Sequence, residues 1–528
     1  MLPALAVVLA VHLRQPVSPE PVFHGDENRH VMTGVFFRDL LADQPVFNVK
    51  QYAESYYVQY PALGLLVWPP LFYFAEGAAM SVFGTSYLVG RCVVTAFALL
   101  ACVYLNRLVS RTHGRGVAAA VVLLFAFTPL VFVYSRQVML EVPTLALCLM
   151  ATFHFVRYLD ESRRRDVFIA AIASACAALT RFDAVYLLPL FVLLLLARSR
   201  FDLLWRREVL AAAGVALLMV APFYALAATE VGSLHSRQAS QAVVPETADQ
   251  TLLERLLYYP ASIPQQTGLV LGVVAVGGLI ELRHWERRRE NLPYLAMLIA
   301  TWLTFTPIAE QQPRHAIYWV PALAVLAWSG ITAISRCRFQ TLLRPALFAL
   351  LLGSTVSAAV SVRRPDLSGY QAAARWVLGQ SPEPSRFLFD GWLDGNFTFH
   401  VRHLDPERRH TVLRGDKLFY GFLCVPETDF AEYASNEQEM LDILHEFDPA
   451  FIVVETPLSL DIPTAERLRD VLREHPEKFE LANEIPVTGR CGKLGGYSLK
   501  IYRNLKRNPQ AGGRIRFEVK GLKRSVSS

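Results

Sequence analysis

The chain has 528 residues, of which 53% are hydrophobic and only 19% are charged, and its mean hydropathy is +0.30. Since soluble domains carry roughly 25% charged residues, this composition excludes an ordinary soluble globular protein. The net charge of +6 is not a nucleic-acid signature either, because the arginines cluster at the ends of apolar segments. Charges are sparse before Arg363 and dense after it, which predicts a membrane region followed by a soluble domain.

Apolar segments approaching the roughly 20 residues that cross a bilayer recur through the first two thirds of the chain. In chain order they are Met1–Leu13, Leu65–Phe83, Tyr87–Leu105, Val117–Tyr134, Val142–Phe155, Phe168–Leu179, Val185–Ala197, Val209–Ala228, Gly268–Ile280, Tyr294–Ile308, Ile317–Ile334 and Leu342–Val360. They predict a polytopic α-helical membrane protein with about 11–13 spans. No basic residue precedes the short first segment, so we interpret it as a span rather than a cleaved signal peptide.

Basic clusters between the apolar segments predict the orientation of the chain, because basic loops stay cytoplasmic. The clusters are Arg107/Arg111/Arg115, Arg163–Arg165, Arg198/Arg200/Arg206/Arg207, Arg283/Arg287–Arg289 and Arg336/Arg338. The alternating loops and everything after Arg363 then lie outside the cytoplasm. The alternation fails once near the N-terminus, which favours a re-entrant or interfacial course for Leu65–Phe83 with its Pro69–Pro70 pair.

Three regions follow: a transmembrane domain over 1–362 with a first external loop at 14–60, an extracytoplasmic α/β domain over 363–505, and a basic tail over 506–528 that we expect to be disordered. Buried strands and helices alternate in the second region, which is typical of an α/β layer. The expected strands and helices are Arg386–Asp390, Glu439–Phe447, Ala450–Glu455, Thr464–His475 and Gly496–Tyr502. Cys424 and Cys491 could form a disulfide if this domain is external.

Acidic residues provide the first candidates for chemistry. Asp26 and Glu27 are adjacent in the first external loop, where an apolar environment would raise a carboxyl pKa towards that of a general base. A solvated acidic turn is the alternative. Glu141 begins an otherwise apolar span, and an ionisable residue there indicates function unless it only complements the helix dipole. Asp390, Asp394 and His400 in the α/β domain fit solvated loop residues better than a site.

External basic residues form the second group of candidates: Arg136, Arg181, Arg314 and His315. Positive charge outside opposes the usual loop bias, so these residues need another explanation. Guanidinium groups bind phosphate oxygens in a bidentate manner, and the phosphate of a lipid carrier would supply such a ligand.

The order of these motifs resembles that of the GT-C fold glycosyltransferases, and within them the dolichyl-phosphate-mannose–protein mannosyltransferase and aminoarabinose transferase group (glycosyltransferase family 39). The matching elements are Asp26-Glu27, Trp68–Leu71, Phe83-Gly84 with Arg91, Arg136 with Glu141–Pro143, Thr180-Arg181, and Arg314-His315 with Pro321. The resemblance covers roughly Phe23–Ala333. The sequence departs from the group at three positions, with Glu141 in place of Asp, Arg181 in place of Lys and His315 in place of Tyr.

This resemblance implies transfer of a sugar, with inversion, from a polyprenyl-phosphate donor to an extracytoplasmic protein, lipid or glycan. Asp26 inherits the role of general base, Glu27 and Glu141 would orient the acceptor or the base, and Arg136, Arg181, Arg314 and His315 would bind the donor phosphate. No cofactor is required and no metal ligand set is evident, although some relatives bind a divalent metal. The expected location is the inner or plasma membrane.

Two other functions stay open on the sequence. A polymerase or ligase of lipid-linked glycans also uses external arginines, but typically with a large external loop late among the spans. A transporter or flippase would place ionisable groups in mid-span and often shows two-fold internal repeats, neither of which we find. The acidic first loop favours the transferase.

Overall fold

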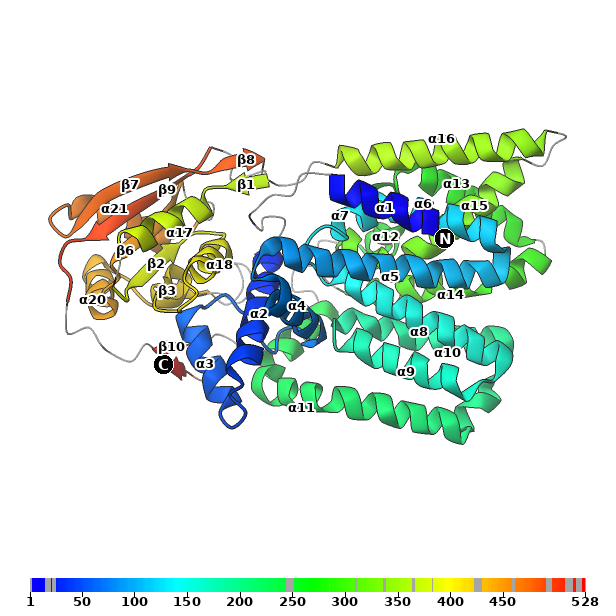
Figure 1. The fold of residues 1–528 in the computed structure, drawn as a ribbon, viewed down its shortest axis with the longest axis horizontal. Helices are drawn as coiled ribbons and strands as arrows, with labels where there is room; N and C mark the ends of the chain where they lie inside the picture. The colour runs from blue at the N-terminus through cyan, green and yellow to red at the C-terminus, as the bar shows by residue number, and fades with distance from the viewer. Residues whose placement is uncertain are drawn as a thin grey trace. The chain divides into compact units, whose positions relative to one another are not determined.

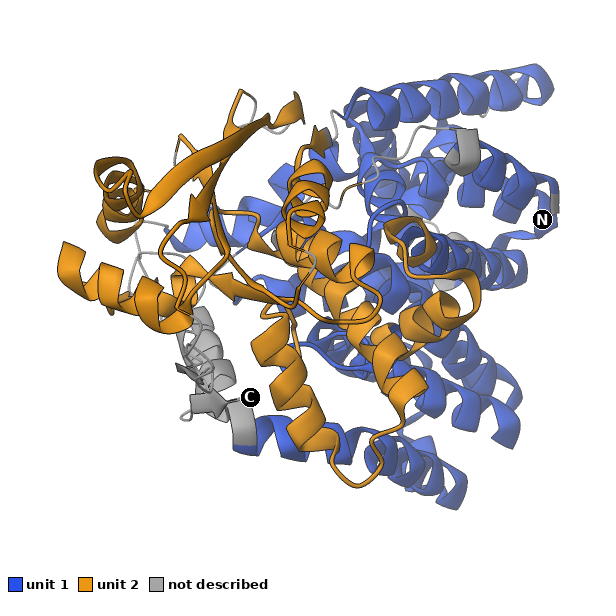
Figure 2. Cartoon of the chain, turned by 60° about the vertical axis from the view of Figure 1, so that its left-hand side comes forward, with its two compact units in different colours: residues 1–16, 66–72, 91–363 blue, residues 17–65, 73–90, 364–528 orange. Residues whose placement is uncertain are grey.

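The computed structural model of the chain describes residues 2–14, 20, 25–243, 251–283, 285–308, 311–335, 339–362, 366–381, 383–421, 430–457, 461–490, 496–508, 516–518 and 525–527. The chain forms two compact units, shown as ribbons in Figure 1 and in two colours in Figure 2. Unit 1 contains residues 1–16, 66–72 and 91–363, and unit 2 contains residues 17–65, 73–90 and 364–528. Each unit is therefore assembled from segments that are distant in sequence.

Unit 1 is a helical bundle. Its helices are α1 (Leu2–Arg14), most of α5 (Tyr87–His113), α6 (Arg115–Ala126), α7 (Pro129–Tyr134), α8 (Glu141–Glu161), α9 (Arg164–Ala178), η1 (Phe182–Tyr186), α10 (Leu187–Arg198), η2 (Phe201–Trp205), α11 (Arg207–Val243), α12 (Leu252–Thr267), α13 (Leu269–Leu279), η3 (Ile280–Arg283), α14 (Trp285–Phe305), η4 (Pro313–Trp319), α15 (Val320–Ile334) and α16 (Gln340–Ser361).

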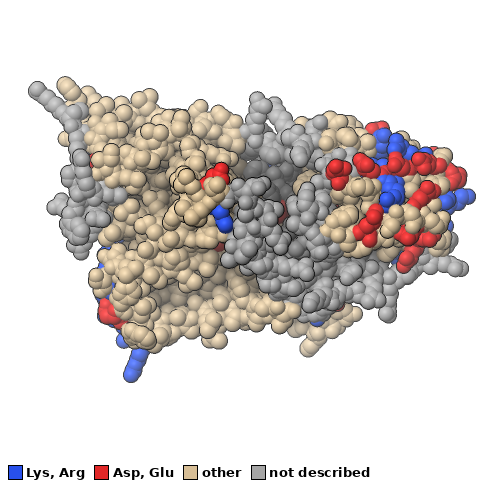
Figure 3. Space-filling view, turned by 180° about the vertical axis from the view of Figure 1, so that it is seen from behind, with Lys and Arg blue, Asp and Glu red and all other residues tan. Residues whose placement is uncertain are grey.

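Several of these helices can cross a membrane. Among the described residues, five are long and apolar enough by length and composition, namely Tyr87–His113, Glu141–Glu161, Arg207–Thr229, Pro313–Ile334 and Gln340–Ser361, and three shorter apolar helices accompany them. On the outward sides of α11 and α16, large apolar side chains such as Leu218 and Leu350 are exposed. Figure 3 shows a face of unit 1 formed mostly by uncharged side chains. Such a surface suits lipid, in which helices satisfy their own backbone hydrogen bonds.

Small residues let helices of the bundle approach closely. A Cβ on Gly278 of α13 would lie 2.0 Å from the backbone oxygen of Leu326, and a Cβ on Gly330 of α15 would lie 2.2 Å from that of Val274. Membrane helices gain van der Waals contact through small residues at their interfaces, because lipid tails compete with apolar side chains. Glycine is therefore required on both sides of this helix pair.

Unit 2 contains a five-stranded sheet of order β3-β2-β6-β9-β7, in which β2 pairs in parallel with β3 and β6, while β9 pairs antiparallel with β6 and β7. Phe387 of β2 lies opposite Val412 on one side and Phe451 on the other. The strands are β1 (Asp366–Ser368), β2 (Arg386–Asp390), β3 (Thr411–Arg414), β4 (Tyr420–Gly421), β5 (Ala431–Glu432), β6 (Phe451–Thr456), β7 (Phe479–Pro486), β8 (Thr488–Arg490), β9 (Ser498–Asn504), β10 (Arg516–Glu518) and β11 (Ser525–Ser527).

The helices of unit 2 come from both ends of the chain. They are α2 (Gly25–Asp43), α3 (Val49–Gln59), α4 (Leu71–Phe83, from Tyr73 on), α17 (Tyr370–Gly379), α18 (Asp394–Leu404), α19 (Gly415–Leu418), α20 (Glu437–Phe447) and α21 (Pro463–Glu474). The segment predicted as the first external loop therefore folds mainly as helices that belong to the same unit as the α/β sheet. The sequence did not predict this association.

The predicted strands and helices of the α/β region are confirmed to within a few residues, and β2 has the predicted bounds. The predicted apolar segment Leu65–Phe83 is not one helix, because α4 begins at Leu71, directly after the Pro69–Pro70 pair. Proline lacks the amide donor that a helix interior needs. In the tail, β10 pairs with β11. Cys424 and Cys491, the predicted disulfide partners, lie outside the described residues.

Candidate functional site

Glu141 is the centre of a charged cluster in unit 1. It is the first residue of α8, and its side chain is fully buried. One of its oxygens, Oε1, lies 3.0 Å from Nη1 of Arg181 and 3.4 Å from Nη1 of Arg314. A buried carboxylate requires such partners, because an unpaired charge away from water is costly. The structure thus brings together three of the residues predicted from sequence.

Arg181 lies between α9 and η1, where the chain turns from one helix to the next. Besides Glu141, its guanidinium contacts Asp183, whose Oδ2 accepts a hydrogen bond from Nε at 2.7 Å. Two carboxylates therefore fix the plane of this guanidinium. Asp183 was not predicted as a site residue, although the Arg-x-Asp spacing at the start of a helical turn is visible in the sequence.

Arg314 and His315 begin the short helix η4, which starts at Pro313. Arg314 is buried, with 8% of its surface exposed. His315 is half-buried, its ring stacks on Phe305 at 6.1 Å between centroids, and its buried Nδ1 has no hydrogen-bond partner among the described residues. This nitrogen is available to a ligand.

Arg136 lies in the turn that leads from α7 to α8. Its side chain is buried, and its guanidinium packs over the ring of Phe132 at 5.1 Å from the centroid. A guanidinium on an aromatic face keeps its charge and its hydrogen-bonding edge. Arg136 lies five residues before Glu141 in the chain, in the turn that precedes the first residue of α8.

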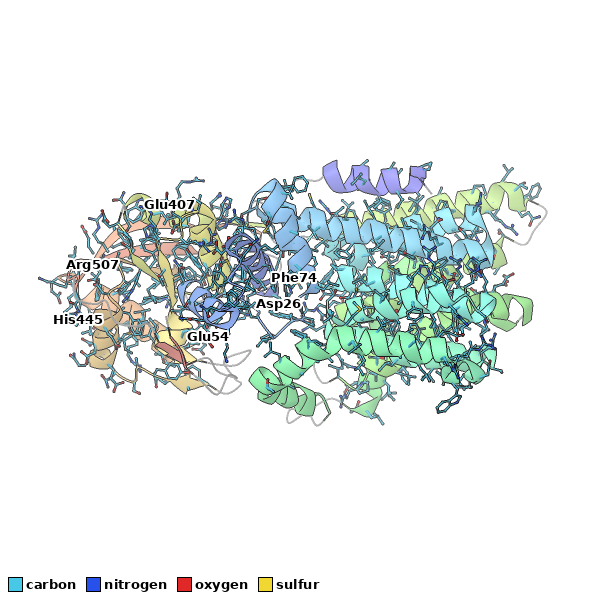
Figure 4. All side chains as sticks on the ribbon, turned by 60° about the horizontal axis from the view of Figure 1, so that its bottom comes forward. Asp26, Glu54, Phe74, Glu407, His445 and Arg507 are labelled. Carbon is cyan, nitrogen blue, oxygen red and sulfur yellow. The ribbon has the colours of Figure 1, made fainter. Side chains whose placement is uncertain are left out.

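Asp26 and Glu27 lie in unit 2, in the first turn of α2 (Figure 4 labels Asp26). Carboxylates are favoured there because the helix dipole places positive potential at the N-terminus. Glu27 is fully buried, whereas Asp26 is half-exposed. A base must reach its substrate, so the difference in exposure favours Asp26 over Glu27 for that role.

Helix α2 packs closely on α4 beyond this acidic turn. Nδ1 of His30 lies 2.6 Å from the hydroxyl of Tyr73, and a Cβ on Gly34 would lie 2.2 Å from Oε2 of Glu76. Glu76 is fully buried, and neither of its carboxyl oxygens has a hydrogen-bond partner among the described residues. Glu76 was not singled out from the sequence, although it is an ionisable residue within the predicted apolar segment Leu65–Phe83.

A buried ion pair joins α2 and α3 to the α/β part of unit 2. Nη2 of Arg402, on α18, lies 2.6 Å from Oδ2 of Asp39, and the hydroxyl of Tyr56 donates to the same oxygen at 2.6 Å. Burial, together with the neighbouring Asp39 charge, raises the pKa of Tyr56 well above its ordinary value. Asn28 packs against Gly395 at the start of α18. The helix that carries Asp26 is thus anchored at two levels.

Asp390, Asp394 and His400 are not solvated loop residues, contrary to the prediction. All three are buried. Asp390 pairs with Arg469 at 2.6 Å, Asp394 pairs with Arg414, and burial lowers the pKa of His400 to about 3. The prediction was wrong because Asp390 ends strand β2 and the other two lie in helix α18, where all three are covered by neighbouring elements that a local sequence pattern cannot show.

No group of three or more His, Cys, Asp and Glu side chains suited to a metal ion is found among the residues that the structure describes. The expectation that the chain needs neither metal nor cofactor stays a prediction.

Comparison with known proteins bears on the predicted family. Residues 67–225 match the sequence model of the family described as dolichyl-phosphate-mannose-protein mannosyltransferase. This segment includes Arg136, Glu141 and Arg181. No curated protein matches the sequence.

Solved structures resemble the whole chain. ArnT from Cupriavidus metallidurans bound to undecaprenyl phosphate has a TM-score of 0.60 and 15% identity, covering 97% of this chain and 98% of that one. The apo state of ArnT gives 0.62 and 15% over 95% and 97%. The oligosaccharyltransferase of Archaeoglobus fulgidus in the apo form gives 0.54 and 13% over 86% and 69%. The predicted fold class, a polytopic helical membrane protein of GT-C type with an α/β domain, is confirmed.

Proposed function

We propose that this chain, which carries a mannosyltransferase-family segment on a GT-C fold, is a membrane glycosyltransferase that moves a sugar from a polyprenyl-phosphate donor to an extracytoplasmic acceptor. The observation that carries the proposal is the buried cluster of Glu141, Arg181 and Arg314 at the end of a membrane-spanning helix. A multi-pass membrane protein has little reason to bury these charges unless a charged ligand uses them. We place the protein in the cell membrane with the α/β domain outside the cytoplasm.

The guanidinium groups of Arg181 and Arg314 are the proposed binding site of the donor phosphate, with Arg136 and His315 as further contacts. Both guanidiniums share Oε1 of Glu141, so the carboxylate holds them in place before the donor arrives. Positive charge fixed in advance stabilises the negative charge that develops on the departing phosphate. Because the lipid phosphate is a good leaving group, its departure needs no protonation by the enzyme.

Asp26 is the proposed general base. It would take the proton of the acceptor hydroxyl or amine as that group attacks the anomeric carbon from the side opposite the phosphate, which inverts the configuration. The bond to the phosphate oxygen breaks as the new glycosidic bond forms. Buried Glu27 is the proposed residue that orients Asp26 or the acceptor, and Glu141 acts through the two arginines.

The proposal is tested with labelled polyprenyl-phosphate sugar and membranes that contain the protein, by following the label into new acceptors. Asp26→Asn should reduce transfer by about 10²–10⁴-fold while donor binding persists, since a base contributes that much to the rate. Asp202→Asn, at an exposed carboxylate on η2, is the matched control and should leave transfer unchanged. Full turnover by Asp26→Asn would remove Asp26 as the base.

A polymerase or ligase of lipid-linked glycans is the second candidate, because the fold is also similar to that of an oligosaccharyltransferase. The two functions differ in the donor. The same assay with a lipid-linked oligosaccharide in place of a single sugar distinguishes them: transfer of the whole glycan only would overturn the first proposal in favour of the second.

A further inference from the structure

A large basic cavity in unit 1 has no role in the proposed transfer. Its volume is about 990 Å³, and it opens between the ends of α5, α6, α8 and α9. Five arginines and one glutamate provide its charged lining: Arg107, Arg111, Arg115, Arg157, Arg163 and Glu161. Phe153 and Pro3 add apolar surface.

The cavity lies at the opposite end of α8 from Glu141. That helix runs from Glu141 to Glu161 and has 21 residues. At about 1.5 Å per residue it is about 30 Å long, which equals the thickness of the hydrocarbon core of a bilayer. The cavity and the Glu141 cluster therefore belong to opposite membrane faces, and the cavity is on the face that the basic loops assign to the cytoplasm.

Nearby carboxylates compensate only some of the arginines in the cavity. Arg111 contacts Glu161 at 2.7 Å and Asp160 at 3.3 Å, and Arg163 contacts Glu161 at 2.9 Å. Arg157 reaches Asp166 at 3.4 Å and Glu161 at 3.5 Å. One carboxylate, Glu161, thus serves three guanidiniums.

Arg107 and Arg115 differ from the other arginines of the cavity. Neither has a carboxylate within 4.0 Å in the part of the chain that is described, and Arg107 lies over the ring of Tyr104 at 5.3 Å from its centroid. Both are exposed. Arg107 and Arg115 therefore line the cavity with guanidinium groups whose N–H donors are not used by a carboxylate among the described residues. Planar guanidinium groups suit the oxygens of a phosphate anion.

The neighbouring basic cluster provides an internal comparison. Arg200 and Arg206 are also at a cytoplasmic helix end, but both pair with Asp202, at 3.2 Å and 3.7 Å. Neither arginine lines the cavity, and we assign both to the basic loops that orient the chain in the membrane. Arg107 and Arg115 differ from this pair in that they line the cavity and have no carboxylate within 4.0 Å among the described residues.

We propose that this cavity binds the phosphate headgroup of an anionic membrane lipid from the cytoplasmic leaflet. The phosphate contacts Arg107 and Arg115, and the adjoining Phe153 and Pro3 accept the first part of the lipid chain. A lipid headgroup fits better than a soluble anion, because the site combines positive charge with apolar surface at the level where headgroups lie. The bound lipid joins the ends of α5 and α6 to α8.

The test measures lipid retained by the full-length protein. The protein is reconstituted in phosphatidylcholine vesicles with or without one fifth phosphatidylglycerol, extracted in mild detergent, and analysed by native mass spectrometry. The variants are Arg107→Gln with Arg115→Gln and, as the matched control of equal charge change, Arg200→Gln with Arg206→Gln. A thermal unfolding scan of each confirms that the fold is retained, and the single variants Arg115→Gln and, as control, Arg206→Gln replace the pairs if the cavity pair does not fold, with a smaller loss of lipid expected in Arg115→Gln alone.

The proposal expects retained phosphatidylglycerol to fall roughly tenfold in the cavity variant and to stay at the wild-type level in the control, as loss of two phosphate contacts requires. Equal retention in both variants, or equal loss in both, would overturn it. Displacement of the lipid by millimolar inorganic phosphate would also overturn it, since the site would then recognise free phosphate.

Discussion

At the level of single residues, Glu141 has the largest electrostatic consequence, because one buried carboxylate holds two guanidiniums. Glu141→Gln keeps the size of the side chain but removes the carboxylate charge that Arg181 and Arg314 share, while Arg181 keeps its contact with Asp183. Removing one member of a buried ion pair costs about 3–5 kcal/mol. We expect a lower midpoint of thermal unfolding and loss of transfer. An unchanged midpoint would show that solvent or lipid already compensates these charges.

Replacing Glu76 should increase the stability of the fold, whereas replacing Glu141 should decrease it. Glu76 is fully buried, and its carboxyl oxygens have no hydrogen-bond partner among the described residues. Burying a polar group in this way destabilises the fold by about 1–3 kcal/mol relative to a group that is hydrogen-bonded. Glu76→Met, which is similar in volume and apolar, should therefore raise the free energy of unfolding by about that amount. The measurement is thermal unfolding in detergent, with Met80→Leu on the same helix as control. A destabilised Glu76→Met would mean that the carboxyl group has a function in binding.

His400 should make stability depend on pH. Burial, followed by the charges of His403 and Arg375, lowers the pKa of His400 in the folded protein to about 3 from an ordinary value of 6.5, while the Glu20 carboxylate at 3.9 Å acts in the opposite direction. Below pH 6.5 the unfolded chain binds a proton that the folded chain does not, so the stability falls as the pH falls. The slope approaches about 1.4 kcal/mol per pH unit and ends near the folded pKa.

His400→Gln removes this contribution. The difference in unfolding free energy between pH 7.5 and pH 5 should therefore be smaller in the variant than in the wild type. An identical pH dependence in both proteins would show that His400 is accessible to protons in the folded state.

At the level of helices and strands, α13 and α15 approach closely through Gly278 and Gly330. Gly330→Val would force a side chain against the backbone of Val274, whereas Gly353 on α16 has no atom within 4 Å of an added Cβ. Overpacking typically costs about 1–3 kcal/mol. We expect Gly330→Val to lower the midpoint of thermal unfolding and Gly353→Val to leave it nearly unchanged. Equal midpoints would show that the helices can separate to accommodate the side chain.

Sequence patterns predicted the individual elements better than their partners. The run Arg386–Asp390 predicted β2 with its observed bounds, because buried parallel strands are short and continuously apolar. The scarcity of charge near the spans made Glu141, Arg181 and Arg314 conspicuous. Asp183 and Glu76 were missed although each has a local signal, the Arg-x-Asp spacing and an ionisable residue within an apolar segment. The packing of Glu76 against Gly34 could not be predicted, since these residues are distant in sequence. Periodicity reports which face of a helix is buried and not what covers it.

At the level of the whole molecule, the acidic helix α2 depends on the last third of the chain. Asp39 and its partner Arg402 are 363 positions apart. Arg402→Met would leave the buried Asp39 with only the partly exposed Arg38 as an ion-pair partner, at 2.7 Å, among the residues that the structure describes, and loss of the buried partner should cost up to about 3–5 kcal/mol. We expect Arg402→Met to expose α2 and α3 to limited proteolysis and to slow transfer, while Arg409→Met, at an exposed arginine that pairs with Glu407, leaves both unchanged. Resistance of Arg402→Met to protease would show that other contacts suffice.

This separation also sets an order of events during biosynthesis. The segment that carries Asp26 leaves the ribosome among the first, yet α18 and its arginine are made only after all the predicted spans have been inserted. Until then Asp39 has its neighbour Arg38 but lacks the buried partner that joins α2 to α18. A nascent chain released before position 394 would therefore carry every predicted spanning segment and no anchored acidic helix.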